Sequence, residues 1–323
     1  MHFLNLIRWK NILIIIITQL FVYVFLTQGE CINTHIDIKL FLLCLSTSFI
    51  ASAGYMINDY SDVGIDVVNK PDKLIVDRYI PRRYVFVMHL VFNFIGILIA
   101  AFINYKFAVL NLFIAFILWQ YSVRFKYYFF LGNICVAGLM ATSLLVVDFA
   151  TNNTLFIWLV FYAVFAFLTG LIREIIKDIE DMEGDARFGA KTLPNSLGVP
   201  KTKIIIYYLM LLTLSLLILS CTYLFYKSYL VLPIYLIITT ALPLSIFFQR
   251  TIFADTKKDF SRLSSFIKLI MLAGVVSMAL RCMNSGQLTV DSGQGEKGVN
   301  FLKVANFDSK KLERNNLLTH NLK

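Results

Sequence analysis

Long apolar runs, separated by short charged segments, dominate the pattern along this chain. A helix needs roughly 17–25 predominantly apolar residues to span a bilayer. Runs at or close to this length predict membrane helices over residues 12–28, 37–57, 84–103, 107–122, 128–148, 154–172, 204–226, 229–248 and 263–281. The first run lacks an A-x-A-like cleavage site, so we expect it to be a retained helix. The pattern therefore predicts an all-α polytopic membrane bundle of about nine transmembrane helices.

The basic residues between these runs are distributed unevenly and predict an orientation. One set of connections is rich in Lys and Arg, and it comprises residues 8–10, 70–83, 124–126, 173–203 and 250–262. The alternate connections hold little beyond Lys39, Lys106 and Lys227. Because cytoplasmic loops carry the excess of Lys and Arg, the first set is expected in the cytosol. We expect an integral protein of a bacterial or archaeal cell membrane.

Composition supports this class and excludes others. Of the 323 residues, 58% are hydrophobic and 15% are charged, whereas soluble domains are about a quarter charged. The net charge of +10 lies in the connections, without the basic and aromatic patch that nucleic-acid binding requires. The five cysteines and four histidines show no disulfide or metal-ligand spacing. We expect one transmembrane domain over 1–283 and a polar, disordered C-terminal tail over 284–323.

Two aspartate triplets share one internal spacing of i, i+3 and i+7, which places three carboxylates on one stripe of a helix. The triplets are Asp59, Asp62 and Asp66, and then Asp178, Asp181 and Asp185. Each follows an apolar run, the second and the sixth, and each precedes a basic connection and two further predicted helices. This repetition predicts an internal duplication, with both carboxylate stripes at the cytosolic mouth of the bundle.

Facing rows of carboxylates suit a hard divalent cation. Magnesium takes oxygen ligands and often bridges one or two carboxylates to phosphate oxygens. Nearby Lys and Arg would bind the remaining phosphate oxygens, and a diphosphate so neutralised is a better leaving group. Helices rich in Phe, Leu and Ile could house a hydrocarbon chain. The implied substrate is an amphiphile with a diphosphate head and a long apolar tail.

Each element also has a simpler interpretation. One acidic triplet at a helix end is more often a solvated face, although two at matching positions favour a site. Asn58 could cap a helix or supply an oxygen ligand. Arg82 and Arg83 could be positive-inside anchors or substrate contacts. Gly184 is expected to let the chain turn after the helix.

At these residues the sequence resembles the UbiA superfamily of intramembrane prenyltransferases. The signatures of that family are NDxxDxxxD and a later DxxxD-type motif, and here they begin at Asn58-Asp59 and at Asp178. The likeness continues in "NKPDK" (69–73), in "IPRR" (80–83) and in "YSVRFK" (121–126), which is followed by Gly132-Asn133. It covers the membrane part and not the tail. Lys73 and Arg82-Arg83 depart from the residues common in the family.

The resemblance implies a nine-helix bundle with a central cavity, two magnesium ions and a prenyl diphosphate donor. It also implies roles for individual residues. The implied metal ligands are Asn58, Asp62, Asp181 and Asp185, and the implied catalytic residues in support are Asp59, Asp66 and Asp178. The implied substrate-binding residues are Lys73, Lys126, Arg173 and Tyr121.

The expected function is magnesium-dependent transfer of a polyprenyl group to a lipid-pathway acceptor. The second motif resembles the branch that attaches a geranylgeranyl group to a glycerol-phosphate ether lipid, and that acceptor's phosphate could bind Arg173, Lys177, Arg187 and Lys191. An aromatic quinone precursor is the alternative acceptor. A cation-coupled transporter is the non-enzyme alternative, although its carboxylates would be expected near the bilayer midplane. A non-catalytic scaffold is a third option.

Overall fold

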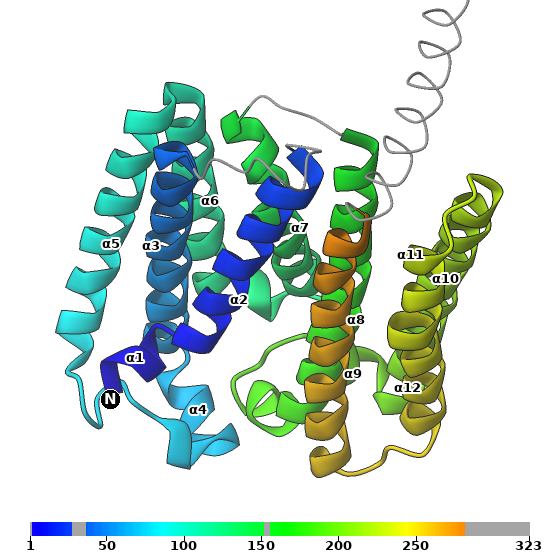
Figure 1. The fold of residues 1–323 in the computed structure, drawn as a ribbon. Helices are drawn as coiled ribbons and strands as arrows, with labels where there is room; N and C mark the ends of the chain where they lie inside the picture. Colours follow the sequence, from blue (N-terminus) through cyan, green and yellow to red (C-terminus); the bar gives the residue numbers. More distant parts are fainter. Residues whose placement is uncertain (1, 28–36, 152–155, 282–323) are drawn as a thin grey trace, which may run out of the picture.

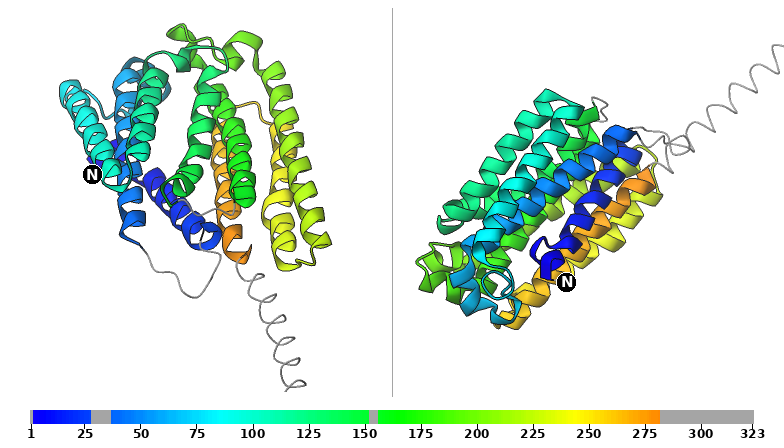
Figure 2. Two further views of the ribbon diagram at one scale, coloured as in Figure 1. Left: turned by 90° about the horizontal axis from the view of Figure 1, so that it is seen from above. Right: turned by 90° about the vertical axis from the view of Figure 1, so that its left-hand side faces the viewer.

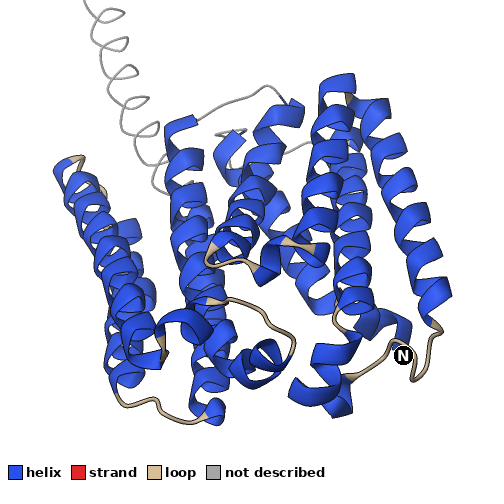
Figure 3. Ribbon diagram, turned by 180° about the vertical axis from the view of Figure 1, so that it is seen from behind, coloured by secondary structure: helices blue, strands red, loops and turns tan. Residues whose placement is uncertain are grey.

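The computed structural model describes residues 2–27, 37–151 and 156–281. These residues are almost entirely helical (Figure 3). Within them, nine helices are long and apolar enough to cross a membrane. The expected all-α bundle is therefore confirmed. The tail that the sequence predicts at 284–323 lies outside the described residues.

The helices agree closely with the predicted spans, apart from their ends (Figure 1). Their bounds are α1 His2–Leu6, α2 Trp9–Phe21, α3 Ile38–Ser61, α4 Val63–Asn69, α5 Arg82–Ile103, α6 Tyr105–Val123, α7 Leu131–Thr151, α8 Phe156–Arg187, α9 Leu193–Leu197, α10 Val199–Tyr226, α11 Val231–Leu236 and α12 Leu242–Ile252. Short 3-10 helices occupy Pro71–Lys73 and Phe125–Tyr127, and π-helical turns occupy Val22–Thr27 and Ile237–Ala241. A further helix, Lys257–Arg281, is drawn in orange in Figure 1, and we call it the last described helix.

Helix α8 lies at the centre of the packing. The helices run side by side, with α7 and α10 both against α8, and with α5 and α6 against α3 (Figure 2). The two largest clusters of buried apolar residues meet on α8, one around Ile172 and Ile176 and the other around Leu159 and Tyr162. Helices α5 and α10 expose apolar side chains on their outer faces, as helices in contact with lipid do.

The first aspartate motif does not lie on one straight helix, and in this detail the expectation was wrong. Helix α3 ends at Ser61, α4 begins at Val63, and Asp62 between them has φ −92° and ψ 3°. Asp62 N donates to Asn58 O over 2.9 Å as the last bond of α3, and Asp66 N donates to Asp62 O over 2.8 Å as the first bond of α4. One helix therefore ends and the next begins at Asp62, and the chain bends there.

The second motif lies on a helix, as its spacing predicts, and this helix is continuous with a membrane span. The predicted apolar span ends at residue 172, and α8 continues without interruption to Arg187. Ile175, Ile176 and Ile179 are buried between the charged positions. This apolar face lets the helix extend through the motif, because it packs into the core while the charged residues line a cavity.

The charged ends of the helices gather at one end of the bundle. Helices α1 and α4, the α6–α7 connection and the carboxyl-terminal turns of α8 all lie near this end (Figure 1, lower part). The last described helix begins there and ends with Arg281 at the opposite end. Both aspartate motifs are therefore on the same face of the bundle, as the duplicated pattern predicts.

Candidate active site

A cavity of about 1050 Å³ runs from the charged end of the bundle into its interior. Its walls come from α2, α3, α4, α6, α7, α8 and the last described helix. Carboxylates and basic side chains line one part, and apolar side chains such as Ile14, Leu139, Phe165 and Leu272 line another. The cavity can therefore take a charged group and an apolar chain that are joined in one molecule.

The predicted site residues converge on this cavity. The lining includes Asn58, Asp59, Asp62, Asp66, Asp178, Asp181 and Asp185, together with Lys126, Arg173 and Tyr121. Lys73 ends the 3-10 helix Pro71–Lys73, and its side chain lies outside the described residues. Two motifs that are more than a hundred residues apart in the sequence thus face each other across one space.

Basic side chains connect the carboxylates of one element to the next. Lys126, in the α6–α7 connection, pairs with Asp62 at the bend. Lys70, just after α4, donates to Asp181 of α8 over 2.6 Å, and Arg8, between α1 and α2, donates to Asp59 of α3 over 2.7 Å. The sequence reasoning did not identify Lys70 and Arg8 as site residues.

Two asparagines fix the helices that carry the motifs. Asn69 donates to the backbone oxygen of Asp181 over 2.9 Å and accepts from the backbone N–H of Gly184 over 2.9 Å, so α4 is held against α8. Asn133 of α7 is buried and donates to Asp178 over 2.7 Å. Gly184 lies inside α8 and not after it, so the expected turn was wrong. A methyl group at Gly184 would overlap the side chain of Asn69.

The pKa values of Asp66 and Lys70, which lie outside the membrane spans, reflect the several negative charges close together at this end of the cavity. Burial is the main cause that raises the pKa of Asp66, and the negative charges of Asp62 and Asp59 add to it. Together they raise this pKa to about 6. Burial alone would lower the pKa of Lys70, but the charge of Asp181 outweighs it and leaves the pKa above its usual value. Both shifts show that added positive charge is favoured at this end of the cavity.

The donor set fits a hard divalent cation. Asn58, Asp62, Asp181 and Asp185 offer amide and carboxylate oxygens, which magnesium prefers. Asp181 Oδ1 is buried and has no hydrogen-bond partner among the described residues, so an acceptor remains unused. Within the described part of the chain no three Asp, Glu, His or Cys meet at one point, and lysines stand between the motifs. The residues therefore suit ions that also take ligands from a phosphate.

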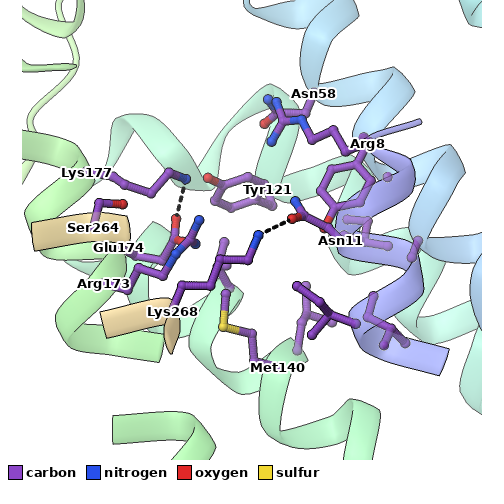
Figure 4. A pocket seen from close by; sticks show the side chains of 18 of the residues that line it. Arg8, Asn11, Asn58, Tyr121, Met140, Arg173, Glu174, Lys177, Ser264 and Lys268 are labelled. Carbon is purple, nitrogen blue, oxygen red and sulfur yellow. Dashed lines mark hydrogen bonds and ion pairs between the residues drawn. The ribbon is translucent and has the colours of Figure 1, made fainter. Parts of the chain in front are cut away.

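A second group of charges lies between α2, α8 and the last described helix (Figure 4). Glu174 accepts from Arg173 over 2.5 Å and from Lys177 over 3.1 Å. Lys268 donates to the side-chain oxygen of Asn11 over 2.8 Å. The sequence analysis missed Lys268, although a lysine inside a predicted apolar span is itself a signal of function.

Two basic residues expected near the acceptor lie elsewhere. Arg187 and Lys191 are exposed and are not among the residues that line this cavity. Arg187 pairs with Glu183 over 2.6 Å, with both side chains more than half exposed.

Comparisons with known proteins agree with the fold and the class of enzyme. The sequence profile of the UbiA prenyltransferase family matches residues 15–272. The digeranylgeranylglyceryl phosphate synthase of Pyrococcus horikoshii is 39% identical over 168 residues, which cover 52% of this chain and 60% of that protein. The synthase of the same name from Methanobrevibacter smithii is 29% identical over 287 residues, which cover 86% of this chain and 96% of that protein. The chain thus spans less than two thirds of the first relative and nearly all of the second.

Solved structures show the same fold. A structure described as a digeranylgeranylglyceryl phosphate synthase in membranes has a TM-score of 0.63 and 26% identity, and the match covers 88% of this chain and 98% of that one. A UbiA homologue from Archaeoglobus fulgidus bound to GPP and Mg²⁺ also has a TM-score of 0.63, with 18% identity and 86% and 99% coverage. The paired motifs, the helical bundle and the profile match all agree: the chain is an integral membrane protein that belongs to the UbiA prenyltransferase family.

Proposed function

We propose that this protein transfers a geranylgeranyl group from its diphosphate to a prenylglyceryl phosphate, in a magnesium-dependent reaction. The observation that carries the proposal is the convergence of both aspartate motifs and Lys126 on one cavity with an apolar interior. The archaeal relatives, which are named digeranylgeranylglyceryl phosphate synthases, support the acceptor. The Archaeoglobus fulgidus structure, which holds GPP and Mg²⁺, supports the donor and the metal.

The metal ligands in this proposal are Asn58, Asp62, Asp181 and Asp185. When bound there, magnesium neutralises the charge that develops on the departing diphosphate. Asp59, Asp66 and Asp178 complete the negative charge, and Arg8 and Asn133 hold two of them in place. Lys70 and Lys126 already contact the carboxylates on both sides, so they can reach the phosphate oxygens between them.

The prenyl chain lies along the apolar part of the cavity in this proposal. Figure 4 shows Tyr121 between Lys177 on one side and Arg8 on the other, where the allylic carbon would follow the diphosphate. As the carbon–oxygen bond to the diphosphate breaks, positive charge grows on that carbon, and the face of an aromatic ring stabilises positive charge. The hydroxyl oxygen of the acceptor then forms the new bond, and a carboxylate such as Asp66 or Asp178 accepts its proton.

We also infer that the reaction takes place at the cytosolic face of the cell membrane. The charged end of the bundle carries the basic connections, and such connections face the cytosol. The carboxylates lie at one end of the bundle, which favours an enzyme that meets a soluble diphosphate head over a transporter with a site at the midplane.

The test is transfer by the purified protein in nanodiscs. Labelled geranylgeranyl diphosphate and Mg²⁺ are supplied with geranylgeranylglyceryl phosphate, with hydroxybenzoate or with dihydroxynaphthoate. We expect a labelled diether phosphate, and no product after EDTA is added. Exclusive prenylation of an aromatic acid would contradict the proposed acceptor but not the proposed role of magnesium. Transfer that persists in EDTA would contradict the proposed dependence on magnesium.

A further inference from the structure

We propose that Arg173, Lys177 and Lys268 form a binding site for the anionic head group of the acceptor, separate from the residues that bind the donor diphosphate. This inference rests on the proposed function and deepens it. Within it, the structure favours a phosphate monoester over a carboxylate, and it assigns Lys268 as a residue that determines acceptor specificity.

The position of the group is the first reason. Arg173 and Lys177 lie on α8 upstream of Asp178, and Lys268 reaches the same space from the last described helix. Figure 4 shows Lys268 extended toward Asn11 of α2, with Arg173 and Lys177 on the α8 side and Asn58 across the cavity. The donor side, in contrast, is built from α3, α4, the α6–α7 connection and the last turns of α8, which carry Asp181 and Asp185. The two anionic substrates would therefore bind to different parts of one cavity.

The charge of the group is the second reason. Within the described residues, the ion pairs of these three cations involve one carboxylate, since Glu174 pairs with both Arg173 and Lys177, whereas Asp178 accepts from Asn133 and is counted with the donor side. Lys268 forms no ion pair among the described residues, and its partner Asn11 is neutral. The excess of two positive charges matches a phosphate monoester, which carries about −1.5 to −2 at neutral pH. An aromatic carboxylate, with a single charge, would leave part of the excess uncompensated.

The hydrogen bonding of the group is the third reason. Arg173 Nε is buried and has no partner among the described residues, so this side chain has a donor to spare. Ser264 lines the cavity one helical turn before Lys268, on the same face of its helix. A phosphate bound here can accept hydrogen bonds from Arg173, Lys268 and Ser264 at once, whereas a single lysine would supply only one charged group.

Lysine is also costly at this depth in a membrane protein. Lys268 lies near the middle of the 25-residue helix Lys257–Arg281, and its side chain turns inward to the cavity. An ionisable residue in such a span is generally retained for a function, with a partner that neutralises it. Because Asn11 does not neutralise it, the missing partner is an anion that enters the cavity.

The test compares two acceptors that differ only in the phosphate: geranylgeranylglyceryl phosphate and geranylgeranylglycerol. In Lys268→Gln we expect the KM for the phosphate acceptor to rise about tenfold, which is the size of one charge-assisted hydrogen bond. The KM for geranylgeranyl diphosphate and the rate with the neutral acceptor should stay at wild-type values. Lys268→Arg should restore most of the affinity, and Lys201→Gln, an exposed lysine on α10, is the matched control for charge.

Equilibrium binding keeps the inference separate from the proposed function. Labelled geranylgeranylglyceryl phosphate is bound to the protein in nanodiscs without donor or Mg²⁺, and hydroxybenzoate is used as a competitor. We expect tighter binding to wild type than to Lys268→Gln by about tenfold, and weak competition by the carboxylate. Equal binding to both proteins, or equal loss for the neutral acceptor, would overturn the site even where transfer is normal. Failure of transfer with this binding difference intact would overturn the proposed function alone.

Discussion

At the scale of single residues, Asp62 and Asp181 stand on opposite sides of the cavity, each held by a lysine from a different element. We expect Asp62→Ala or Asp181→Ala to lower the rate of prenyl transfer by about 10²- to 10³-fold or more, because each removes a proposed ligand of the magnesium that stabilises the leaving diphosphate. The protein should still insert and purify as wild type does. Asp255→Ala, at an exposed carboxylate outside the cavity, is the control. Wild-type rates in both cavity variants would contradict the metal assignment.

The raised pKa of Asp66 gives a pH dependence. Its folded-state pKa of about 6 lies above the ordinary value of 3.8 for an aspartate, so the folded protein binds this proton more tightly than the unfolded chain does. A proton on Asp66 removes a negative charge beside the proposed metal ligands, so it weakens the attraction of the site for a cation. We therefore expect the Kd for Mg²⁺ to fall as the pH rises through about 6. Titrations at pH 5.5 and 7.5 check this, and Asp66→Asn should flatten the difference. A Kd that rises with pH would contradict it.

The identity of most site residues could be predicted from the sequence, because short polar motifs in an apolar chain are conspicuous. The lysines and arginine that complete the site were harder to find. Arg8 and Lys70 look like ordinary positive-inside residues, and only the fold shows that they reach Asp59 and Asp181. Lys268 differs from these, since its place inside an apolar run could have identified it.

At the scale of elements, the contact between α4 and α8 sets the distance between the two motifs. Gly184→Ala should disrupt it, because the added methyl group overlaps Asn69, which holds both Asp181 and Gly184. We expect a loss of about 1–3 kcal/mol in stability, which is typical of overpacking, together with lower transfer activity. Thermal unfolding and transfer assays measure both effects.

Gly138→Ala is the matched control for this variant. Gly138 also lies inside a helix, α7, but a methyl group there would meet no atom within 4 Å. Alanine favours a helix over glycine by about 1 kcal/mol, so this variant should be neutral or slightly more stable. Equal effects of the two substitutions would contradict the role of the α4–α8 contact.

Element boundaries were the least predictable feature. The helix carrying the second motif was expected to turn at Gly184, beyond an apolar span that ends at residue 172, but α8 continues to Arg187, with buried isoleucines on one face of its charged part. The bend at Asp62 could not be predicted for a different reason. The spacing of the first motif is helical throughout, and only the three-dimensional structure shows where the axis changes direction.

At the scale of the whole molecule, the path of the helices predicts which connections share a side of the membrane. Asp72 follows α4 at the charged end, and Ser228 follows α10 at the opposite end. In a background without the five native cysteines, Ser228→Cys in intact cells should react with a membrane-impermeant maleimide. Asp72→Cys should react only after the cells are opened. Labelling of both positions from one side would contradict the predicted orientation.

The lysines at the mouth of the cavity have a further consequence for the order in which ligands bind. Lys126 and Lys70 occupy the carboxylates that a metal ion must reach, so they act as built-in competitors. A metal ion that binds alone breaks the ion pairs of both lysines and leaves them without an anionic partner. When the diphosphate binds together with the metal ion, its oxygens can pair with the lysines instead. Metal and donor should therefore strengthen each other's binding by the same factor.

This coupling can be measured with Mn²⁺ and an unreactive thio-analogue of the prenyl diphosphate. The analogue should lower the Kd for Mn²⁺ in wild type. Lys126→Gln should bind Mn²⁺ alone more tightly than wild type and should lose part of the coupling. Weaker binding of Mn²⁺ alone by this variant would contradict the idea. With the lysines acting in this way, the enzyme without donor binds free divalent ions weakly, and it completes its metal site when the donor binds.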